Sequence, residues 1–256
     1  MITKKAYAKL NLFLNVKGKR DDGYHDLEMV NIMVGLYDEL EFTLTDGEII
    51  CDTSKSELNS KNNLSYKVAV YLKKLFRVQK GVKIFIFKNI PVGSGMGGGS
   101  SDAAVTIEAL NELWNLNLSF EQMFEISKNF GSDTPYCFYR GPAVVKGTGF
   151  DITPIDLDIS NFDIMLFTPK VNVSTGVVFS SLINNNKYSL DDAVLCLKSK
   201  DYNTFIKGLH NDLEDTVFNM YPEVKAQYDI LKRVHGPEGL FMTGSGSTIV
   251  KIKEKK

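Results

Sequence analysis

The chain has 256 residues, of which 43% are apolar and 24% are charged, and its formal net charge is −1. This composition is typical of a soluble globular protein that is long enough for one large or two ordinary domains. A net charge so close to zero gives no electrostatic case for a nucleic-acid partner or an anionic membrane surface, and we expect neither.

Three cysteines and the start of the chain indicate the compartment. Cys51, Cys137 and Cys196 are far apart and odd in number, which fits neither a disulfide framework nor a metal cluster. No apolar signal-peptide core follows Met1, and no stretch approaches the roughly eighteen apolar residues of a membrane span. We therefore expect a cytoplasmic protein with reduced thiols, no bound structural metal and no membrane segment.

The first predicted element is a strand over residues 6–16. Lys9 and Asn11 point to the same face of this strand, because successive side chains alternate between faces. A polar pair of this kind is usually a solvent-exposed face, so the residues alone leave a functional role open. The apolar residues on the opposite face are Ala8, Leu10, Leu12, Leu14 and Val16.

A polar loop follows at residues 17–25, with the sequence Lys-Gly-Lys-Arg-Asp-Asp-Gly-Tyr-His. It combines a basic cluster with the aromatic ring of Tyr24 and with His25, one of only three histidines in the chain. A hairpin loop that carries a chance histidine would look much the same.

Periodicity predicts the next elements. Alternating apolar residues indicate strands at 40–44 and 82–87, and apolar residues at helical spacing indicate a helix over 64–75. Asn63 stands directly before this helix, where an asparagine most often serves as the N-cap.

The stretch at residues 91–102 joins the strand at 82–87 to a second helix. Five glycines among its last eleven residues cannot form a packed core, because they supply almost no apolar surface and are costly to order. Uncovered backbone N–H groups at a helix N-terminus bind phosphate oxygens. We therefore predict a phosphate site in which Ser100 and Ser101 cap the helix or donate to the phosphates, with a flexible linker as the alternative. The helix face is marked by Ala103, Ile107, Leu110 and Trp114.

Two better-known glycine motifs fit this stretch poorly. Gly93-x-Gly95-x-x-Gly98 matches the dinucleotide fingerprint, but the acidic residue about twenty positions on would be Glu112, inside the predicted helix. The Walker motif needs a Lys-Ser or Lys-Thr pair after the glycines, and none follows. The chain also contains neither the His-Arg-Asp nor the Asp-Phe-Gly sequence of protein kinases.

The second half of the chain begins with a helix that Ser119 and Gln122 open as a capping box and that runs to about Asn129. In the segment Gly131-Ser-Asp133-Thr-Pro that follows, the residues alone suggest only a helix stop, with Asp133 in the turn. The character of the sequence changes at Thr153-Pro154, which predicts a boundary between domains 1–153 and 154–256.

Later elements are a strand at 162–167, a helix that carries Phe179 in its first turn, a helical region over 211–231, and strands at 239–242 and 248–252. His210 and His235 show no partner pattern for metal or triad chemistry, so we expect both to be structural.

Four segments together resemble the GHMP kinases, the family of galactokinase, homoserine kinase and mevalonate kinase. They are Ala6-x-Ala8-Lys9-x-Asn11-Leu12, the glycine stretch, Gly131-Ser-Asp133-x-Pro, and Met242-Thr-Gly-Ser-Gly-Ser247. The chain departs from the family at Met96, which replaces a usual leucine, at Asn31, where many members carry an aromatic near the substrate, and at Phe150-Asp151, where a glutamate usually stands.

The resemblance implies an α+β, two-domain GHMP kinase fold, with a ribosomal-protein-S5-like N-terminal domain and a ferredoxin-like C-terminal domain. It implies ATP with Mg²⁺ as co-substrate, Asp133 as general base and Lys9 as its electrostatic partner. The third glycine motif, at 242–247, is expected to pack near the phosphate loop. The residues implied in ATP binding are Pro91, Val92, Gly93, Ser94, Gly95, Met96, Gly97, Gly98, Gly99, Ser100, Ser101 and, near the adenine, Asn63.

The Gly23-Tyr24-His25 loop resembles that of one member of the family, in which it holds the cytosine of a small-molecule substrate that carries a cytidine diphosphate group. By this resemblance Tyr24 stacks on the base, His25 bonds to its edge, and Phe179 supplies a second aromatic; Asn11 also contacts the substrate. The alternatives are another GHMP kinase, of the mevalonate or homoserine type, and a non-catalytic nucleotide or sugar sensor of the same fold.

Overall fold

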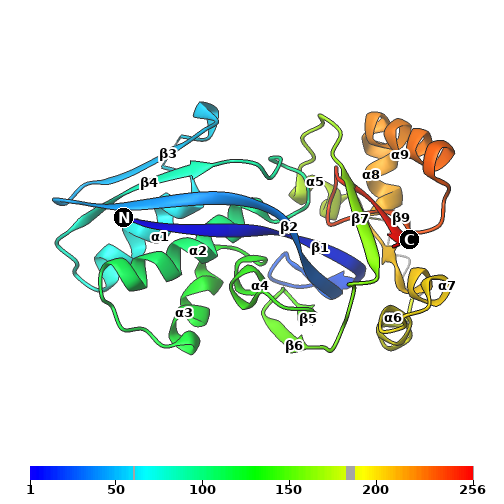
Figure 1. The fold of residues 1–256 in the computed structure, drawn as a ribbon, viewed down its shortest axis with the longest axis horizontal. Coiled ribbons are helices and arrows are strands. Elements are labelled where there is room, and N and C mark those ends of the chain that lie inside the picture. Colours follow the sequence, from blue (N-terminus) through cyan, green and yellow to red (C-terminus); the bar gives the residue numbers. More distant parts are fainter. Residues whose placement is uncertain (60, 183–187, 256) are drawn as a thin grey trace. The chain divides into compact units, whose positions relative to one another are not determined.

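The computed structural model describes residues 1–59, 61–182 and 188–255, and Figure 1 shows its helices and strands. The chain forms two compact units, each assembled from separate stretches of sequence. Unit 1 comprises Met1–Lys9, Met33–Pro91 and Gly97–Arg140, and unit 2 comprises Leu10–Ile32, Val92–Met96 and Gly141–Lys256. The division into domains 1–153 and 154–256 stays a prediction.

Unit 1 is a sheet with helices packed on it, as the α+β fold class predicts. β4 pairs antiparallel with β2 and parallel with β3, in the order β3-β4-β2-β1. The long strands β1 and β2 contribute residues to both units. The elements are β1 (Ile2–Lys19), β2 (His25–Thr45), β3 (Ile49–Thr53), η1 (Ser56–Leu58), α1 (Leu64–Leu75), β4 (Gly81–Phe87), α2 (Gly98–Leu113), α3 (Phe120–Ser127), η2 (Lys128–Phe130) and α4 (Thr134–Tyr139).

One hydrophobic core joins the sheet of unit 1 to α1 and α2. Alternate residues of β2 and β4 and the apolar faces of both helices are fully buried in it, and burying such a side chain stabilises the fold by about 1.5–3 kcal/mol. The helix face predicted from residues 103–114 is therefore confirmed. The core includes Leu40, Phe42, Ile84, Ile86, Leu72, Ile107 and Leu110.

Side-chain caps start α1 and α3 where the sequence predicts. Asn63 accepts a hydrogen bond from the backbone N–H of Ser65 at the start of α1. Ser119 and Gln122 form the predicted capping box, and the helical segment ends at Phe130. These caps satisfy N–H groups that would otherwise lack partners in the first helical turn.

Unit 2 contains a three-stranded antiparallel sheet in the order β7-β10-β9. Its part of β2 pairs antiparallel with β5, β5 pairs with β6, and its part of β1 pairs parallel with β8. Figure 1 shows α8 and α9 as adjacent helices of this unit. The elements are β5 (Ala143–Gly147), β6 (Asp151–Pro154), β7 (Phe162–Phe167), α5 (Thr175–Ser180), α6 (Leu190–Leu197), α7 (Tyr202–Phe205), η3 (Ile206–Gly208), β8 (His210–Asn211), α8 (Glu214–Met220), α9 (Pro222–His235), β9 (Leu240–Met242) and β10 (Ile249–Glu254).

Two details of unit 2 differ from the sequence prediction. Phe179 lies in the last turn of α5 rather than the first, because the helix already begins at Thr175. The predicted helical region over 211–231 starts instead with the short strand β8 and breaks into α8 and α9 at Tyr221. The break has a local cause: Pro222 opens α9, and a residue before proline is driven out of the helical conformation.

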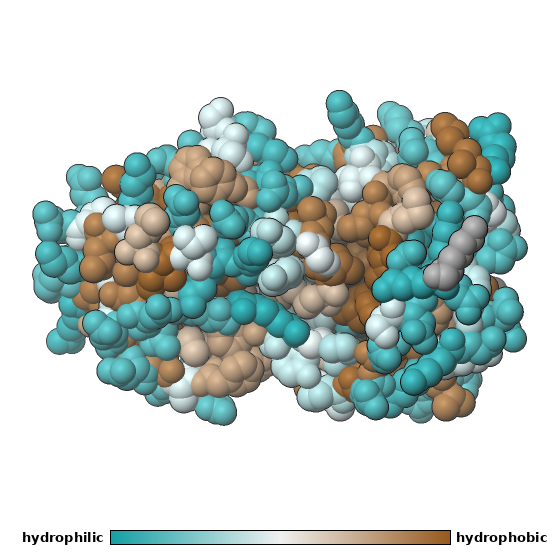
Figure 2. Space-filling model, viewed as in Figure 1, coloured by the Kyte–Doolittle hydropathy of each residue, from teal (hydrophilic) through white to brown (hydrophobic). Residues whose placement is uncertain are grey.

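Hydrophilic residues cover much of the face seen in Figure 2, and hydrophobic residues reach it in several separate places.

Across the described parts of the chain, no helix combines the length and apolar character needed to cross a bilayer.

The carboxyl group of Glu214 in α8 is expected to make the stability of the folded protein depend on pH. Burial raises the pKa of its carboxyl to about 7, although its Oε2 accepts a hydrogen bond of 2.7 Å from the Met242 backbone N–H. The folded protein then keeps a proton that the unfolded chain releases near its ordinary pKa of 4.5. The stability contributed by this proton is lost as the pH rises from about 4.5 to about 7.

We therefore expect Glu214→Gln, which keeps an acceptor without the charge, to remove about 1–3 kcal/mol of the fall in unfolding free energy between pH 5 and pH 8. Urea unfolding of both proteins at the two pH values measures this difference. The exposed neighbour Asp215 supplies the control, Asp215→Asn. Parallel pH profiles for wild type and Glu214→Gln would contradict the prediction.

Candidate active site

Lys9 and Asp133, far apart in the sequence, form an ion pair in unit 1. Lys9 Nζ lies 3.4 Å from Asp133 Oδ2, and the Lys9 side chain is 5% exposed whereas that of Asp133 is 37% exposed. Asp133 stands at the N-cap position of α4 but makes no side-chain capping bond. Its carboxylate therefore faces both a buried cation and solvent.

The burial of β1 overturns the solvent-face interpretation of its polar residues. Lys9, Asn11, Phe13 and Asn15 are all buried, like the apolar residues that alternate with them. A buried ammonium group is costly unless it is paired, and Asp133 supplies an opposite charge for Lys9.

Gly97 lets the Lys9 side chain pass the start of α2. Gly97 is the N-cap residue of α2 and has a positive φ of 67°. A Cβ atom at this position would lie 3.0 Å from Lys9 Cγ and 3.3 Å from Lys9 Cε. Only glycine therefore fits both the backbone conformation and the space that the lysine occupies.

Ser100 and Ser101 do not cap α2, which corrects one of the two roles predicted for them. Both lie inside the helix, because it begins at Gly98. Ser101 Oγ is buried and has no hydrogen-bond partner among the described residues. The remaining role, donation to a phosphate, stays a prediction.

Val92–Met96, in the first half of the glycine stretch, belongs to unit 2 and packs against the third glycine motif at 242–247, as predicted. The Ser94 carbonyl oxygen accepts a hydrogen bond of 3.2 Å from the Thr248 backbone N–H. A Cβ atom on Gly95 would lie only 2.6 Å from the Thr243 carbonyl oxygen, and one on Gly244 only 2.5 Å from the Gly95 carbonyl oxygen. The two backbones thus meet at a distance that excludes side chains.

In unit 2 the structure brings two of the predicted base-binding residues together. The rings of His25 and Phe179 lie 5.1 Å apart with an interplanar angle of 34°. Burial, followed by the charge of Lys19, lowers the pKa of His25, which favours the neutral ring. Tyr24 is 60% exposed, and its predicted stacking on a base stays a prediction.

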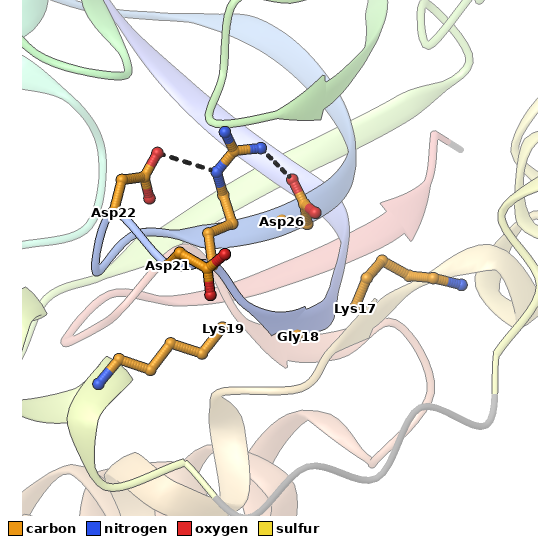
Figure 3. A pocket seen from close by; sticks show the side chains of 7 residues that line it. Lys17, Gly18, Lys19, Asp21, Asp22 and Asp26 are labelled. Atoms are coloured by element: carbon orange, nitrogen blue, oxygen red, sulfur yellow. Dashed lines mark hydrogen bonds and ion pairs between the residues drawn. The ribbon is translucent and has the colours of Figure 1, made fainter.

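The loop before His25 surrounds a polar hollow of about 520 Å³. Figure 3 shows it with lysine and aspartate side chains around it. The guanidinium group of Arg20 donates to Asp22 over 3.1 Å and to Asp26 over 3.0 Å. These bonds hold the turn that presents Tyr24, whose backbone N–H donates to Asp22 Oδ1. The hollow lies in the volume range of small-molecule sites but is more polar than most.

Asn31 is a buried residue whose importance the sequence did not reveal. The Asn11 amide donates to Asn31 Oδ1 over 2.6 Å, and the Asn11 backbone N–H donates to Thr243 Oγ1 over 2.8 Å. Asn31 Nδ2 is buried without a hydrogen-bond partner among the described residues. In the sequence, Asn31 was noticed only because many family members carry an aromatic residue at this position.

Two other groups bear on the site. Cys137 lies beside the Gly97 carbonyl oxygen, and burial raises the pKa of its thiol, so it is not a thiolate nucleophile. Asn63 uses its side chain as the cap of α1, and its proposed place near an adenine stays a prediction.

Residues 63–141 match the GHMP kinases N terminal domain, and residues 193–255 match the GHMP kinases C terminal domain. A 4-diphosphocytidyl-2-C-methyl-D-erythritol kinase of Shouchella clausii is 40% identical over 98% of this chain and 86% of its own length. One of Bacillus cereus is 40% identical over 96% of this chain and 86% of its own length.

The chain belongs to the GHMP kinase family. The relatives also carry the name of the family member that the Gly23-Tyr24-His25 loop resembles, which confirms that prediction. A crystal structure of 4-(cytidine 5'-diphospho)-2C-methyl-D-erythritol kinase aligns with this GHMP kinase at a TM-score of 0.81 and 27% identity, over 97% of this chain and 89% of that one. Methanococcus jannaschii mevalonate kinase shares the fold, with a TM-score of 0.70 at 18% identity, over 100% of this chain and 90% of its own. The predicted fold class is confirmed.

Proposed function

We propose that this chain transfers the γ-phosphate of ATP to the 2-hydroxyl of 4-diphosphocytidyl-2-C-methyl-D-erythritol, in the methylerythritol phosphate route to isoprenoid precursors. GHMP kinases use ATP as phosphate donor, and relatives at about 40% identity over nearly the whole chain bear the name of this enzyme. The ion pair between Lys9 and Asp133 is the observation that supports the catalytic roles proposed for these two residues.

Asp133 is the general base in the proposal. Phosphoryl transfer requires the attacking hydroxyl to lose its proton, and a positioned carboxylate accepts it. The Asp133 carboxylate is the partly exposed member of the pair and makes no capping bond, so an oxygen remains accessible to the hydroxyl.

Lys9 and the start of α2 stabilise charge. The ammonium group of Lys9 lies beside the base and offsets negative charge as the phosphoryl group moves. The backbone N–H groups at the N-terminus of α2 hold the phosphates of ATP, together with the positive end of the helix dipole.

Mg²⁺ enters the proposal with the nucleotide. Among the residues that the structure describes, no group of three or more His, Cys, Asp or Glu side chains could hold a metal by itself. In kinases Mg²⁺ is held by the phosphates of the nucleotide, by water and by one or two side chains, rather than by a cage of protein ligands, and it would neutralise phosphate charge. From the chain, the site offers it the Ser101 hydroxyl, which has no hydrogen-bond partner in the described part of the chain.

A coupled assay of ADP release tests the proposed function. We expect turnover with 4-diphosphocytidyl-2-C-methyl-D-erythritol, and at most background rates with mevalonate, homoserine or galactose. Preference for one of the other three would make the chain another GHMP kinase. Nucleotide binding without ADP release from any of them would favour the sensor.

Base recognition has a separate test in Tyr24→Ala. Stacking on an aromatic ring stabilises a bound base by about 1–3 kcal/mol, and a contact remote from the reacting hydroxyl acts on ground and transition states alike. The KM for the cytidyl substrate should rise about 5- to 150-fold, with the KM for ATP little changed. Phe179→Ala should behave similarly, with coupling in the double variant.

The control is Phe120→Ala, which removes an exposed aromatic of unit 1. It should leave the KM for the cytidyl substrate unchanged. An unaltered cytidyl KM in Tyr24→Ala, or a loss that falls on ATP, would remove Tyr24 from the base site.

A further inference from the structure

Three charged side chains form a buried cluster in unit 1 at the two ends of the glycine stretch. Lys88 Nζ donates to Asp102 Oδ2 over 2.7 Å, and it also donates to Asp38 Oδ2. None of the three side chains is more than 6% exposed. We call Asp38, Lys88 and Asp102 the buried ion cluster.

Asp38 fixes the backbone that leads into the glycine stretch. The ladder between β2 and β4 ends with the pair Glu39 and Phe87. Directly beyond it, Asp38 Oδ1 accepts hydrogen bonds from the backbone N–H groups of Asn89, over 2.6 Å, and Ile90, over 2.8 Å. The carboxylate therefore takes the place of a strand partner up to the residue before Pro91.

Lys88 and Asp102 fix the other end, where α2 begins. Asp102 lies in the early part of α2, and a Cβ atom on Gly98 would lie 3.5 Å from Lys88 Nζ. The same ammonium group is thus bonded to the carboxylate that holds residues 89 and 90 and to a carboxylate of α2. One cation joins the two ends of the stretch.

The composition of the cluster argues for a positioning role. It contains two carboxylates for one ammonium group, and Asp102 Oδ1 has no hydrogen-bond partner within the described residues. Burial raises the pKa of Asp102. Burial also opposes the charge on Lys88, but the two carboxylates raise the pKa of Lys88. Apolar side chains of similar volume commonly stabilise a fold as well as buried ions do, and in some proteins buried ions instead specify one geometry.

We propose that the buried ion cluster positions the ends of the glycine stretch so that its backbone N–H groups can bind the phosphates of ATP, without itself touching the nucleotide. Asp38, Lys88 and Asp102 are positioning residues in this proposal. The inference rests on the proposed function, because it takes ATP as the ligand of the stretch.

The test compares Asp102→Ala with Asp102→Asn in the full chain. Asp102→Ala removes the one of the two carboxylates bonded to Lys88 that lies on α2. We expect the Kd for ATP, measured by calorimetry, and the KM for ATP to rise at least tenfold. The KM for the cytidyl substrate should change less than twofold. Asp102→Asn keeps an oxygen that can accept from Lys88 and should recover most of the ATP affinity.

Leu110→Ala supplies a control for a loss of stability alone, since Leu110 lies on the same helix and is fully buried in the core. It should lower the thermal midpoint of unfolding while the Kd for ATP stays within twofold of wild type. Equal ATP affinity in wild type and Asp102→Ala, or an equal loss in Leu110→Ala, would overturn the inference. If Asp102→Ala does not fold, Asp38→Asn replaces it. Both oxygens of Asp38 accept hydrogen bonds, so the amide nitrogen of asparagine would face either Lys88 or the backbone N–H groups of residues 89 and 90. The same rise is expected, and the same outcomes would contradict the inference.

The proposed function and this inference fail in different ways. A wild-type chain that binds no ATP would overturn the proposed function, and the inference with it. A wild-type chain that binds ATP and phosphorylates the cytidyl substrate, with no loss of ATP affinity in the cluster variants, would overturn the inference alone.

Discussion

Asp133→Asn is expected to lower kcat by about 10²–10⁴-fold, the usual contribution of a general base. Asparagine keeps the shape of the side chain but cannot accept the proton of the substrate hydroxyl. The Kd for ATP should stay close to the wild-type value, because the phosphates are held by the glycine stretch in the proposed mechanism. Steady-state kinetics and calorimetry measure the two quantities.

The control for Asp133→Asn is Asp46→Asn, which removes the carboxylate of an exposed ion pair with Lys80 in the same unit. It should leave kcat unchanged, because an exposed pair contributes little to the fold. Retention of wild-type kcat in Asp133→Asn would remove Asp133 from the mechanism.

Gly97→Val is expected to weaken ATP binding by about 100-fold or more while the chain still folds. Valine disfavours the positive φ of this residue, and its methyl groups would meet the Lys9 side chain, which lies 3.0 Å from the position of a Cβ. The substitution therefore disturbs both the phosphate-binding backbone and the lysine. Calorimetry with ATP, together with circular dichroism as a check of folding, measures the effect.

Gly147→Val is the control for backbone strain in the absence of a side-chain clash. Gly147 has a φ of 64°, close to that of Gly97, but a Cβ atom there would meet nothing within 4 Å. It should cost stability through backbone strain alone and leave the Kd for ATP unchanged. Unchanged ATP affinity in a folded Gly97→Val protein would place the nucleotide elsewhere.

The sequence predicted elements whose signals are local. The strand at 162–167, the helix face with Ile107 and Leu110, and the capping box of Ser119 follow from alternation, helical spacing and neighbouring residues, and the structure confirms them. The pairing of Lys9 with Asp133 was anticipated by resemblance and not from residue spacing, since nothing local connects two positions so far apart.

Other features depend on packing that no local pattern reports. Alternation along β1 showed that Lys9 and Asn11 share a face, but could not show that this face is covered as well. Asp38 and Lys88 look like ordinary surface charges in the sequence, and only the fold places them together beside Asp102. Asn31 appeared as a departure from a family pattern, and its bond to Asn11 became visible only when β1 and β2 were in place.

The strand order of unit 2 limits when it can fold during synthesis. β10 is the middle strand of the β7-β10-β9 sheet and is also the last of these strands to leave the ribosome. Before β10 is synthesised, the strand that pairs with both β7 and β9 is missing. The backbone N–H and C=O groups on those strand edges can then pair with other chains. Unit 1 needs no residue beyond Arg140. A nascent chain can therefore complete unit 1 once Arg140 has emerged, whereas the β7-β10-β9 sheet has to wait for Ile249–Glu254.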